Sequence, residues 1–325
     1  MIIPQKIDYV KLHEQKENKW QERRAQAVAM AYRICRFPSL KNRAGRMAHC
    51  SEITHSYICK VCGYPHVKSG GYCRDRLCPL CSWRLTMTKY AQMVEVLNSL
   101  TEQFKDGMYA SMLTLTIRNV PIDGLRPALE GITKAWKEML RRKGMKQVRG
   151  WARNIEITHN NATHTYHPHV HILLLWQDVE EPDNVAVQIV HDWERMLGVD
   201  YKTVWHHELA YLKDEQAAGI ADEQTKAEAA AAEAAMYTLA SSTLLQIPQA
   251  ELEQFAGAIK GIRMTAYGGI IKDMRRALEL REEEIEDEKT DNTIETCPKC
   301  GGEMLHLIRK WNADSECYEI IGGDI

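Results

Sequence analysis

The segment Tyr166-His167-Pro168-His169-Val170-His171-Ile172-Leu173-Leu174-Leu175-Trp176 decides the fold, because its alternating histidines lead directly into an apolar run. Successive side chains of a β-strand point to opposite faces, so His167, His169 and His171 are expected on one face of a strand that becomes buried. Neutral imidazole is a good ligand for divalent metals, and a rigid strand holds several rings in place for one ion. The segment therefore predicts a metal site on a strand.

A second strand is predicted for residues 151–158, Trp-Ala-Arg-Asn-Ile-Glu-Ile-Thr, which also alternates. The turn-rich residues 159–163 separate it from the histidines and predict an antiparallel hairpin, with Glu156 opposite the imidazoles. A carboxylate with two imidazoles leaves positions open for water and phosphate oxygens, which suits Mg²⁺ or Mn²⁺ acting as a Lewis acid. We therefore expect Glu156, His169 and His171 to hold a catalytic ion, with His167 outside the set.

Strands and helices are interspersed around this hairpin, which predicts an α+β fold with an antiparallel central sheet covered by helices. Apolar periodicity and composition indicate the further elements in chain order: a helix at 88–104, a strand at 108–118, helices at 125–143 and 183–196, a strand at 201–206, an Ala- and Glu-rich helix at 213–242, and a strand with a basic helix at 258–280.

A cysteine module precedes this core. Cys59-x-x-Cys62 and Cys78-x-x-Cys81 are separated by a spacing typical of a four-thiolate Zn²⁺ site. Few large apolar residues lie between the pairs, so folding there is expected to depend on the metal. Two neighbouring residues are alternative ligands: Cys73 and His66.

A third pair, Cys297-Pro-Lys-Cys300-Gly-Gly, has the form of half a zinc ribbon. For its other half the sequence offers only His306 and Cys317 nearby, so a second zinc site stays open. The remaining cysteines are interpreted as structural: Cys35 and Cys50.

The chain of 325 residues has ten cysteines and a formal net charge of −2 at pH 7. No basic-then-apolar signal opens it, and no apolar run reaches the roughly 20 residues that span a bilayer. We expect a cytoplasmic protein with no membrane partner, whose cysteines are thiols or metal ligands and not disulfides.

The near-neutral charge conceals basic clusters, because acidic residues concentrate towards the C-terminal end. One cluster comprises Arg23, Arg24, Arg33, Arg36, Lys41, Arg43 and Arg46, and a second Lys134, Lys137, Arg141, Arg142, Lys143, Lys146 and Arg149. Clustered cations are what phosphate-backbone binding needs, and solvated helix faces are the alternative. The residues expected to contact DNA are Arg74, Arg76, Arg84, Arg118, Lys143, Arg263 and Lys272.

Several motifs together resemble those of HUH endonucleases. Pro168-His-Val-His after the Ile-Glu-Ile-Thr strand resembles their metal motif, Leu113-Thr-Leu-Thr-Ile-Arg their first motif, and Glu233-Ala-Ala-Met-Tyr their nucleophile helix. The segments 73–84 and 259–272 resemble the replication initiators of rolling-circle plasmids within that superfamily. The resemblance spans about residues 55 to 280 and implies the HUH fold with an inserted or N-terminal zinc module.

The resemblance implies that Tyr237 attacks origin DNA, forming a 5′-phosphotyrosine bond and leaving a 3′-hydroxyl primer. It also implies that Glu233, one helical turn earlier, directs hydrolysis when replication ends. This chain departs from the family in lacking a lysine beside the tyrosine, so phosphate must be positioned from elsewhere, with Arg118, Arg263 or Lys272 as candidates. Tyr211 is the reserve nucleophile.

Five parts are expected along the chain: a basic helical arm (1–54), the zinc module (55–87), the catalytic domain (88–281), an acidic linker (282–295) and a ribbon-like tail (296–325). The expected partners are origin DNA, single-stranded or extruded as a hairpin, and the host replication machinery; a host helicase is expected because the sequence has no helicase-like phosphate loop. A relaxase or transposase of the same superfamily is one alternative function. A non-enzymatic, zinc-dependent DNA-binding regulator is another.

Overall fold

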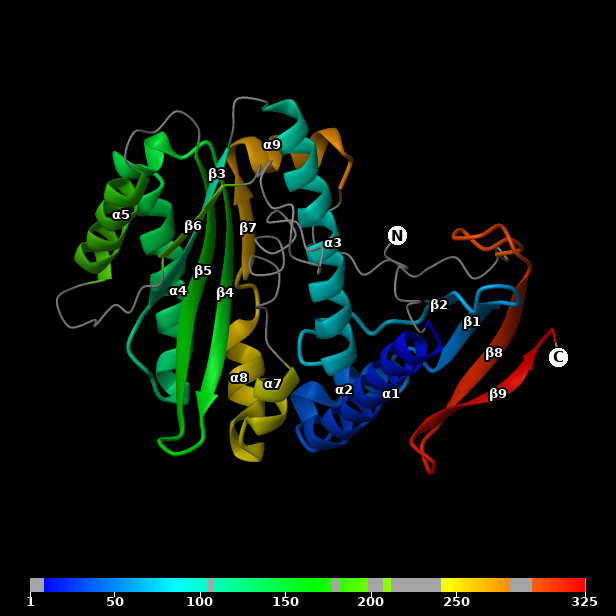
Figure 1. Cartoon of the computed structure of the whole chain (residues 1–325). Helices are drawn as coiled ribbons and strands as arrows, with labels where there is room; N and C mark the ends of the chain where they lie inside the picture. The colour runs from blue at the N-terminus through cyan, green and yellow to red at the C-terminus, as the bar shows by residue number, and fades with distance from the viewer. Residues whose placement is uncertain are drawn as a thin grey trace. The chain divides into compact units, whose positions relative to one another are not determined.

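The computed structural model describes residues 9–104, 108–176, 182–197, 207–211, 241–280 and 294–324. The chain divides into two compact units, the first comprising Met1–Trp83 with Ile285–Ile325 and the second Arg84–Glu284 (Figure 1). This division differs from the five expected parts, because the cysteine module and the C-terminal tail belong to one unit. The expected acidic linker lies almost wholly outside the described residues.

The first unit combines helices with a four-stranded antiparallel sheet in the order β2-β1-β8-β9. Its elements are α1 (Tyr9–Ile34), the 3₁₀ turn η1 (Pro38–Leu40), α2 (Lys41–Ala48), β1 (Ile53–Cys59), β2 (Pro65–Ser69), β8 (Met304–Asn312) and β9 (Cys317–Gly323). Figure 1 shows β1 and β8 side by side although they come from opposite ends of the chain, and their register runs from Ile53↔Lys310 to Cys59↔Met304.

The second unit contains a five-stranded antiparallel sheet in the order β6-β3-β5-β4-β7. The strands are β3 (Tyr109–Thr116), β4 (Gly150–Asn160), β5 (Thr165–Trp176), β6 (His207–Tyr211) and β7 (Thr265–Gly268). The mixture of helices with an antiparallel sheet confirms the predicted α+β class. The strand expected at 201–206 lies outside the described residues, and β6 directly follows it.

Helices cover both faces of this sheet (Figure 1). The remaining elements are α3 (Pro79–Gln103), α4 (Ile122–Met139), the 3₁₀ turn η2 (Gly144–Gln147), α5 (Pro182–Leu197), α7 (Ser241–Gln246), the 3₁₀ turn η3 (Gln249–Glu251), α8 (Leu252–Ile259) and α9 (Gly269–Ala277). On one face, Leu97 of α3 and Ile271 of α9 pack with Met112 and Leu173. On the other, Trp136 of α4 meets the ring of Trp151 edge-on, with ring centroids 5.0 Å apart.

The central hairpin β4–β5 has the predicted position and register. Asn160 Oδ1 accepts hydrogen bonds from the backbone N–H groups of Ala162 and Thr163, and His164 takes a positive φ of 50°. Such Asx-type turns reverse a chain tightly. The turn sets the pairing Thr158↔His167, Glu156↔His169 and Asn154↔His171, so these side chains share one face of the sheet.

The sequence Tyr267-Gly268-Gly269 connects β7 to α9 in very little space. A Cβ atom on Gly268 would overlap the indole of Trp151, and one on Gly269, whose φ is +56°, would overlap the carbonyl of Arg149. Only glycine combines that conformation with so close an approach. The pair therefore allows β7 to lie along β4, beside the metal-motif strands.

Candidate functional site

Glu156, His169 and His171 converge on the α3 face of the sheet. Glu156 Oε2 lies 2.7 Å from His169 Nε2 and 3.1 Å from His171 Nε2. The carboxylate is nearly buried and the two imidazoles retain about an eighth of their side-chain exposure. Their ligand atoms all lie within 4.8 Å of one another. The sequence prediction that these three side chains meet is therefore matched by the geometry.

The hydrogen bonding of His169 places a proton or a metal ion between this ring and Glu156. His169 Nδ1 lies 3.3 Å from the backbone carbonyl of His167, and a carbonyl only accepts, so Nδ1 carries the ring proton. In the neutral ring Nε2 then presents a lone pair to the carboxylate oxygen of Glu156. Two acceptors 2.7 Å apart need a proton or a metal ion between them. This donor set, two imidazoles and a carboxylate, fits a divalent ion with open positions.

The charge state of Glu156 also suits a cation. Burial raises the pKa of this carboxyl, but its short-range interactions with the His169 and His171 rings outweigh the burial and hold the pKa at about 2. Glu156 is thus ionised throughout the physiological range. The neighbouring His167 has a pKa lowered by burial and by the charge of His169, which favours its neutral form.

The neighbouring strand β3 supports the ring of His171. Thr114 Oγ1 of β3 lies 3.1 Å from Nδ1 of His171, which fixes the ring with Nε2 facing Glu156. A contact at the second ring nitrogen is how proteins usually orient a metal-binding histidine.

A chain of hydrogen bonds reaches the same face from α3. The ammonium of Lys89, nearly buried, donates to Thr265 Oγ1 at 2.6 Å, and that hydroxyl donates to Asn154 Oδ1 at 3.0 Å. The direction is fixed because an ammonium group only donates. Asn154 is 2% exposed and stands opposite His171 in the register.

The amide nitrogen of Asn154 is left as an unused donor. Its Oδ1 is engaged by Thr265, and Nδ2 is buried without a hydrogen-bond partner in the described structure. A buried donor without an acceptor costs free energy, so an acceptor from a ligand would remove that cost. Neither Asn154 nor Lys89 is among the residues predicted from the sequence. Asn154 could have been predicted to lie near the metal ligands, because it precedes Glu156 by two residues and so shares its strand face. Nothing in the amphipathic helix that contains Lys89 predicts that this lysine reaches the site.

The cysteines form two separate groups, which corrects the predicted grouping. Cys78 and Cys81 do not share a site with Cys59 and Cys62. The two clusters are Cys50, Cys73, Cys78 and Cys81, and Cys59, Cys62, Cys297 and Cys300. The cause is the β1–β8 pairing, which places Cys59 at the end of β1 opposite Met304 and so brings the C-terminal pair to it.

The first cluster contains two residues that the sequence did not assign, Cys50, interpreted as structural, and Cys73, named as an alternative. Cys50 Sγ lies 3.4 Å from Cys81 Sγ and 3.8 Å from Cys78 Sγ, and Cys73 Sγ lies 3.6 Å from Cys81 Sγ. Hydrogen bonds from the other thiols lower the pKa of Cys50 strongly, while they raise that of Cys78. One thiol therefore ionises at the expense of its neighbours, and a cation is needed for all four to do so.

Comparison with known proteins identifies the family. A family model described as "Replication protein" matches residues 65–319. The chain belongs to this family. Similar curated proteins, each called "Protein rep", occur in Lentilactobacillus hilgardii (27% identical, covering 94% of this chain and 96% of the relative) and Lactiplantibacillus plantarum (28%, 93% and 95%). Another, from Streptococcus pneumoniae serotype 2 (strain D39 / NCTC 7466), is 26% identical and covers 93% and 92%. No solved structure matches the chain significantly.

Two candidate catalytic residues of this replication protein, Tyr237 and Glu233, lie outside the described residues. The reserve nucleophile Tyr211 is described in its backbone. It pairs with Tyr109 at one end of β3, whereas His169 pairs with Thr116 at the other end. Seven residues of strand separate the two positions by roughly 23 Å, which disfavours Tyr211 as a nucleophile acting at the triad.

Two of the expected DNA contacts lie at the triad end of the sheet. Arg118 is exposed two residues beyond Thr116, the partner of His169. Arg263 is exposed two residues before Thr265, at the end of β7 nearest Glu156, and its carbonyl accepts a hydrogen bond from Arg153.

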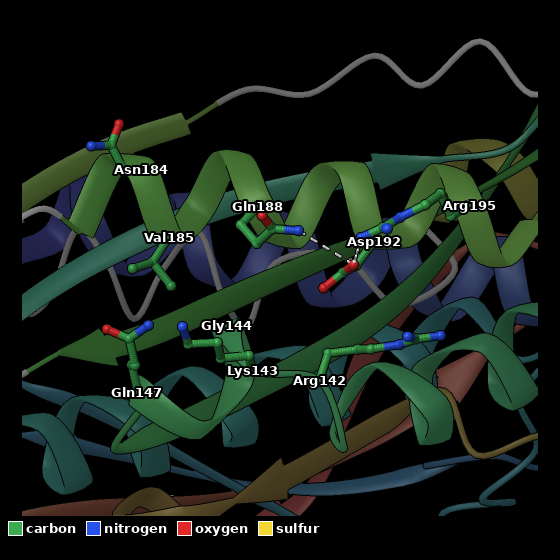
Figure 2. Close-up of a pocket in the computed structure, with 9 residues that line it drawn as sticks. All are labelled: Arg142, Lys143, Gly144, Gln147, Asn184, Val185, Gln188, Asp192 and Arg195. Atoms are coloured by element: carbon green, nitrogen blue, oxygen red, sulfur yellow. Dashed lines mark hydrogen bonds and ion pairs between the residues drawn. The ribbon is translucent and has the colours of Figure 1, made fainter.

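Lys143 lies elsewhere, in a pocket formed by the segment after α4 and by α5. Figure 2 shows Arg142 and Lys143 on one side of the pocket and the ion pair of Asp192 with Arg195 on the other. Helices α4 and α5 lie on the sheet face opposite to α3, so the pocket is not on the face that carries the triad (Figure 1).

The remaining expected contacts are distributed over both units. Arg74 and Arg76 are exposed beside the first cysteine cluster, Arg84 is half-buried in α3, and Lys272 is exposed on α9. By contrast, Arg24 of the N-terminal basic cluster is buried and donates to the carbonyl of Ala48, so it has a structural role. No helix in the described parts of the chain is long and apolar enough to cross a membrane.

Proposed function

We propose that this replication protein initiates rolling-circle replication of a plasmid by nicking one strand of origin DNA and rejoining it. The proposal rests mainly on one observation: Glu156, His169 and His171 converge on one face of the sheet, with their ligand atoms within 4.8 Å of one another. The match to the "Replication protein" family supports the biological setting. The HUH-type fold assignment is part of the same proposal, and an antiparallel sheet with the motif on a central strand supports it.

Glu156, His169 and His171 would hold a Mg²⁺ or Mn²⁺ ion. When bound, the ion supplies Lewis-acid polarisation of the scissile phosphate. The protein's own contribution is to keep Glu156 ionised and to fix both rings through Thr114 and the carbonyl of His167. A rigid, correctly protonated ligand set is what such a site needs before substrate arrives.

Asn154 would donate a hydrogen bond from Nδ2 to a non-bridging oxygen of the scissile phosphate. Lys89 and Thr265 hold the amide in the orientation that turns Oδ1 towards β7 and leaves Nδ2 free to donate. A fixed donor aimed at developing negative charge stabilises a transition state without reorganisation. This arrangement supplies part of the phosphate positioning that the missing lysine beside Tyr237 would have provided.

Tyr237 would carry the covalent step. Its phenolic oxygen forms a bond to phosphorus as the bond to the 3′ oxygen breaks; the phenol loses its proton to solvent, and the 3′ oxygen gains one. The products are a 5′-phosphotyrosine and a free 3′-hydroxyl that primes synthesis. Glu233 would later take a proton from water, so that water hydrolyses the regenerated origin. Glu233→Ala should therefore still nick but accumulate products longer than one plasmid unit, which gel analysis of replication products would detect.

The cluster of Cys50, Cys73, Cys78 and Cys81 would bind Zn²⁺, in place of the mixed cysteine set predicted from spacing. Soft thiolates at these separations favour zinc. Exposed Arg74 and Arg76 beside it would contact the DNA backbone, with Arg84, Arg118, Lys143, Arg263 and Lys272 as the further contacts. Strand separation would require a host helicase.

The decisive experiment incubates the purified protein with labelled single-stranded origin DNA and Mn²⁺. Wild type should form a covalent adduct, while His169→Ala and EDTA treatment should abolish it and leave DNA binding largely intact. His191→Ala, at an exposed histidine of α5, is the matched control and should behave as wild type. Binding without any adduct in wild type would favour the DNA-binding regulator. A relaxase or transposase would form the adduct but not support plasmid replication.

A further inference from the structure

The pairs Cys59–Cys62 and Cys297–Cys300 form two turns of the same construction. Each has the sequence Cys-x-x-Cys-Gly, and the glycine has a positive φ, 68° for Gly63 and 71° for Gly301. In each turn the glycine N–H donates to the carbonyl of the first cysteine, at 3.0 Å and 2.8 Å. The two turns are far apart in sequence but have the same local geometry, which indicates that both serve the same purpose where their cysteines meet.

The N–H groups inside these turns point at sulfur. Val61 and Cys62 donate to Cys59 Sγ at 3.4 Å each, and Lys299 donates to Cys297 Sγ at 3.4 Å. Such hydrogen bonds favour the thiolate, which is the form that binds metal. Cysteines that served only as buried apolar side chains would not need these N–H hydrogen bonds.

The distances between the sulfurs match a tetrahedral metal site. Cys300 Sγ lies 3.3 Å from Cys62 Sγ and 3.5 Å from Cys59 Sγ, and Cys62 Sγ lies 3.7 Å from Cys297 Sγ. Four thiolates about 2.3 Å from one zinc ion stand about 3.8 Å from each other. A disulfide would require about 2.05 Å, and all four cysteines are free thiols.

Little apolar packing holds the two turns together. The buried cluster around them consists of Tyr57, Cys59, Cys297 and Met304. A core of this size adds little to the β1–β8 pairing that also joins these segments, and small modules of this kind fold around a metal. Gly302 completes the fit, because a Cβ there would press on Val61 and Cys59.

We propose that Cys59, Cys62, Cys297 and Cys300 bind a second zinc ion in a zinc ribbon that joins residues 294–324 to the β1–β2 hairpin. The ribbon is distinct from the Cys50–Cys73–Cys78–Cys81 cluster and from the catalytic ion of the proposed function. Its sheet, β2-β1-β8-β9, is completed only when the C-terminal segment is attached. The zinc therefore makes the end of the chain a structural part of the N-terminal unit.

Elemental analysis of the purified full-length protein tests the proposal. Wild type should contain two equivalents of zinc, and Cys300→Ser, which changes an exposed cysteine, should contain one. Cys73→Ser should also contain one, and Cys35→Ser, outside both clusters, should keep two. Because the serine variants can fail to fold, Co²⁺-substituted wild type provides a second measurement, with absorption of two tetrahedral four-thiolate sites expected.

A single equivalent in wild type that Cys300→Ser retains would overturn the proposal, as would a cobalt spectrum of one site. Iron in place of zinc would overturn the choice of metal. Zinc content is measured independently of DNA nicking. The zinc-ribbon proposal can therefore be refuted while the proposed function is supported, and the proposed function can be refuted while the zinc ribbon is supported.

Discussion

Replacing Asn154 with leucine should separate catalysis from stability. The side chains have nearly the same size, and Asn154 is 2% exposed. The change removes the unpartnered Nδ2 donor and the Oδ1 acceptor of Thr265, while Thr265 still accepts from Lys89. Glu156, His169 and His171 keep their own contacts. The variant therefore tests the donor and not the metal ligands.

The two expected effects differ greatly in size. Removing the buried, unsatisfied N–H of Asn154 stabilises the folded protein by about 1–3 kcal/mol, but the buried Thr265 hydroxyl loses its acceptor, which costs a similar amount. The free energy of unfolding should therefore change by less than about 2 kcal/mol. Loss of one donor to the transition state should slow nicking by about 10²- to 10³-fold.

Single-turnover nicking of labelled origin DNA and urea unfolding of the same preparation measure the two quantities. Asn119→Leu is the control: this exposed asparagine donates to Thr165 Oγ1, and its loss should leave nicking unchanged. The reasoning about Asn154 is refuted if Asn154→Leu nicks at the wild-type rate with metal bound. A large loss of stability would likewise show that its amide is satisfied in the folded protein.

Three further predictions concern single residues. Tyr237→Phe should bind origin DNA normally and form no covalent adduct, and peptide mapping of the wild-type adduct would reveal DNA attached elsewhere. Gly268→Ala should lower the free energy of unfolding by about 1–3 kcal/mol, because the added methyl group would displace the Trp151 indole. An unchanged melting temperature in calorimetry would contradict this prediction. Burial and the Glu251 carboxylate raise the pKa of Tyr166, so above about pH 10 the phenol ionises in the unfolded state but not in the folded state, and the free energy of unfolding decreases with pH there. Tyr166→Phe should make that decrease smaller when the free energy of unfolding is measured as a function of pH.

Local patterns predicted those features of the site that depend on one hairpin. Alternation in two neighbouring strands was sufficient to bring Glu156 opposite His169, because the register of a hairpin follows from its turn. Lys89 and Thr265 reach the same face from other elements, and their contact depends on how α3 and β7 pack against β4. No periodicity in either segment encodes that packing.

The cysteines show the same limit more clearly. Spacing alone paired Cys59 and Cys62 with the next Cys-x-x-Cys, since the separation suits one zinc site. Their actual neighbours lie more than two hundred residues later and arrive through the pairing of β1 with β8. A strand pairing of that sequence separation has no local signature, so the sequence alone reveals the turns but cannot match them.

The ligand triad comes from a single hairpin, and Glu156 and His171 are only fifteen residues apart. Closing so short a loop costs little chain entropy compared with bringing distant segments together. The site should therefore assemble early in folding, with the hairpin, before the covering helices dock. The geometry of the three ligands then follows from the register of the hairpin alone, whereas the orientation of Asn154 also requires α3 and β7 to dock.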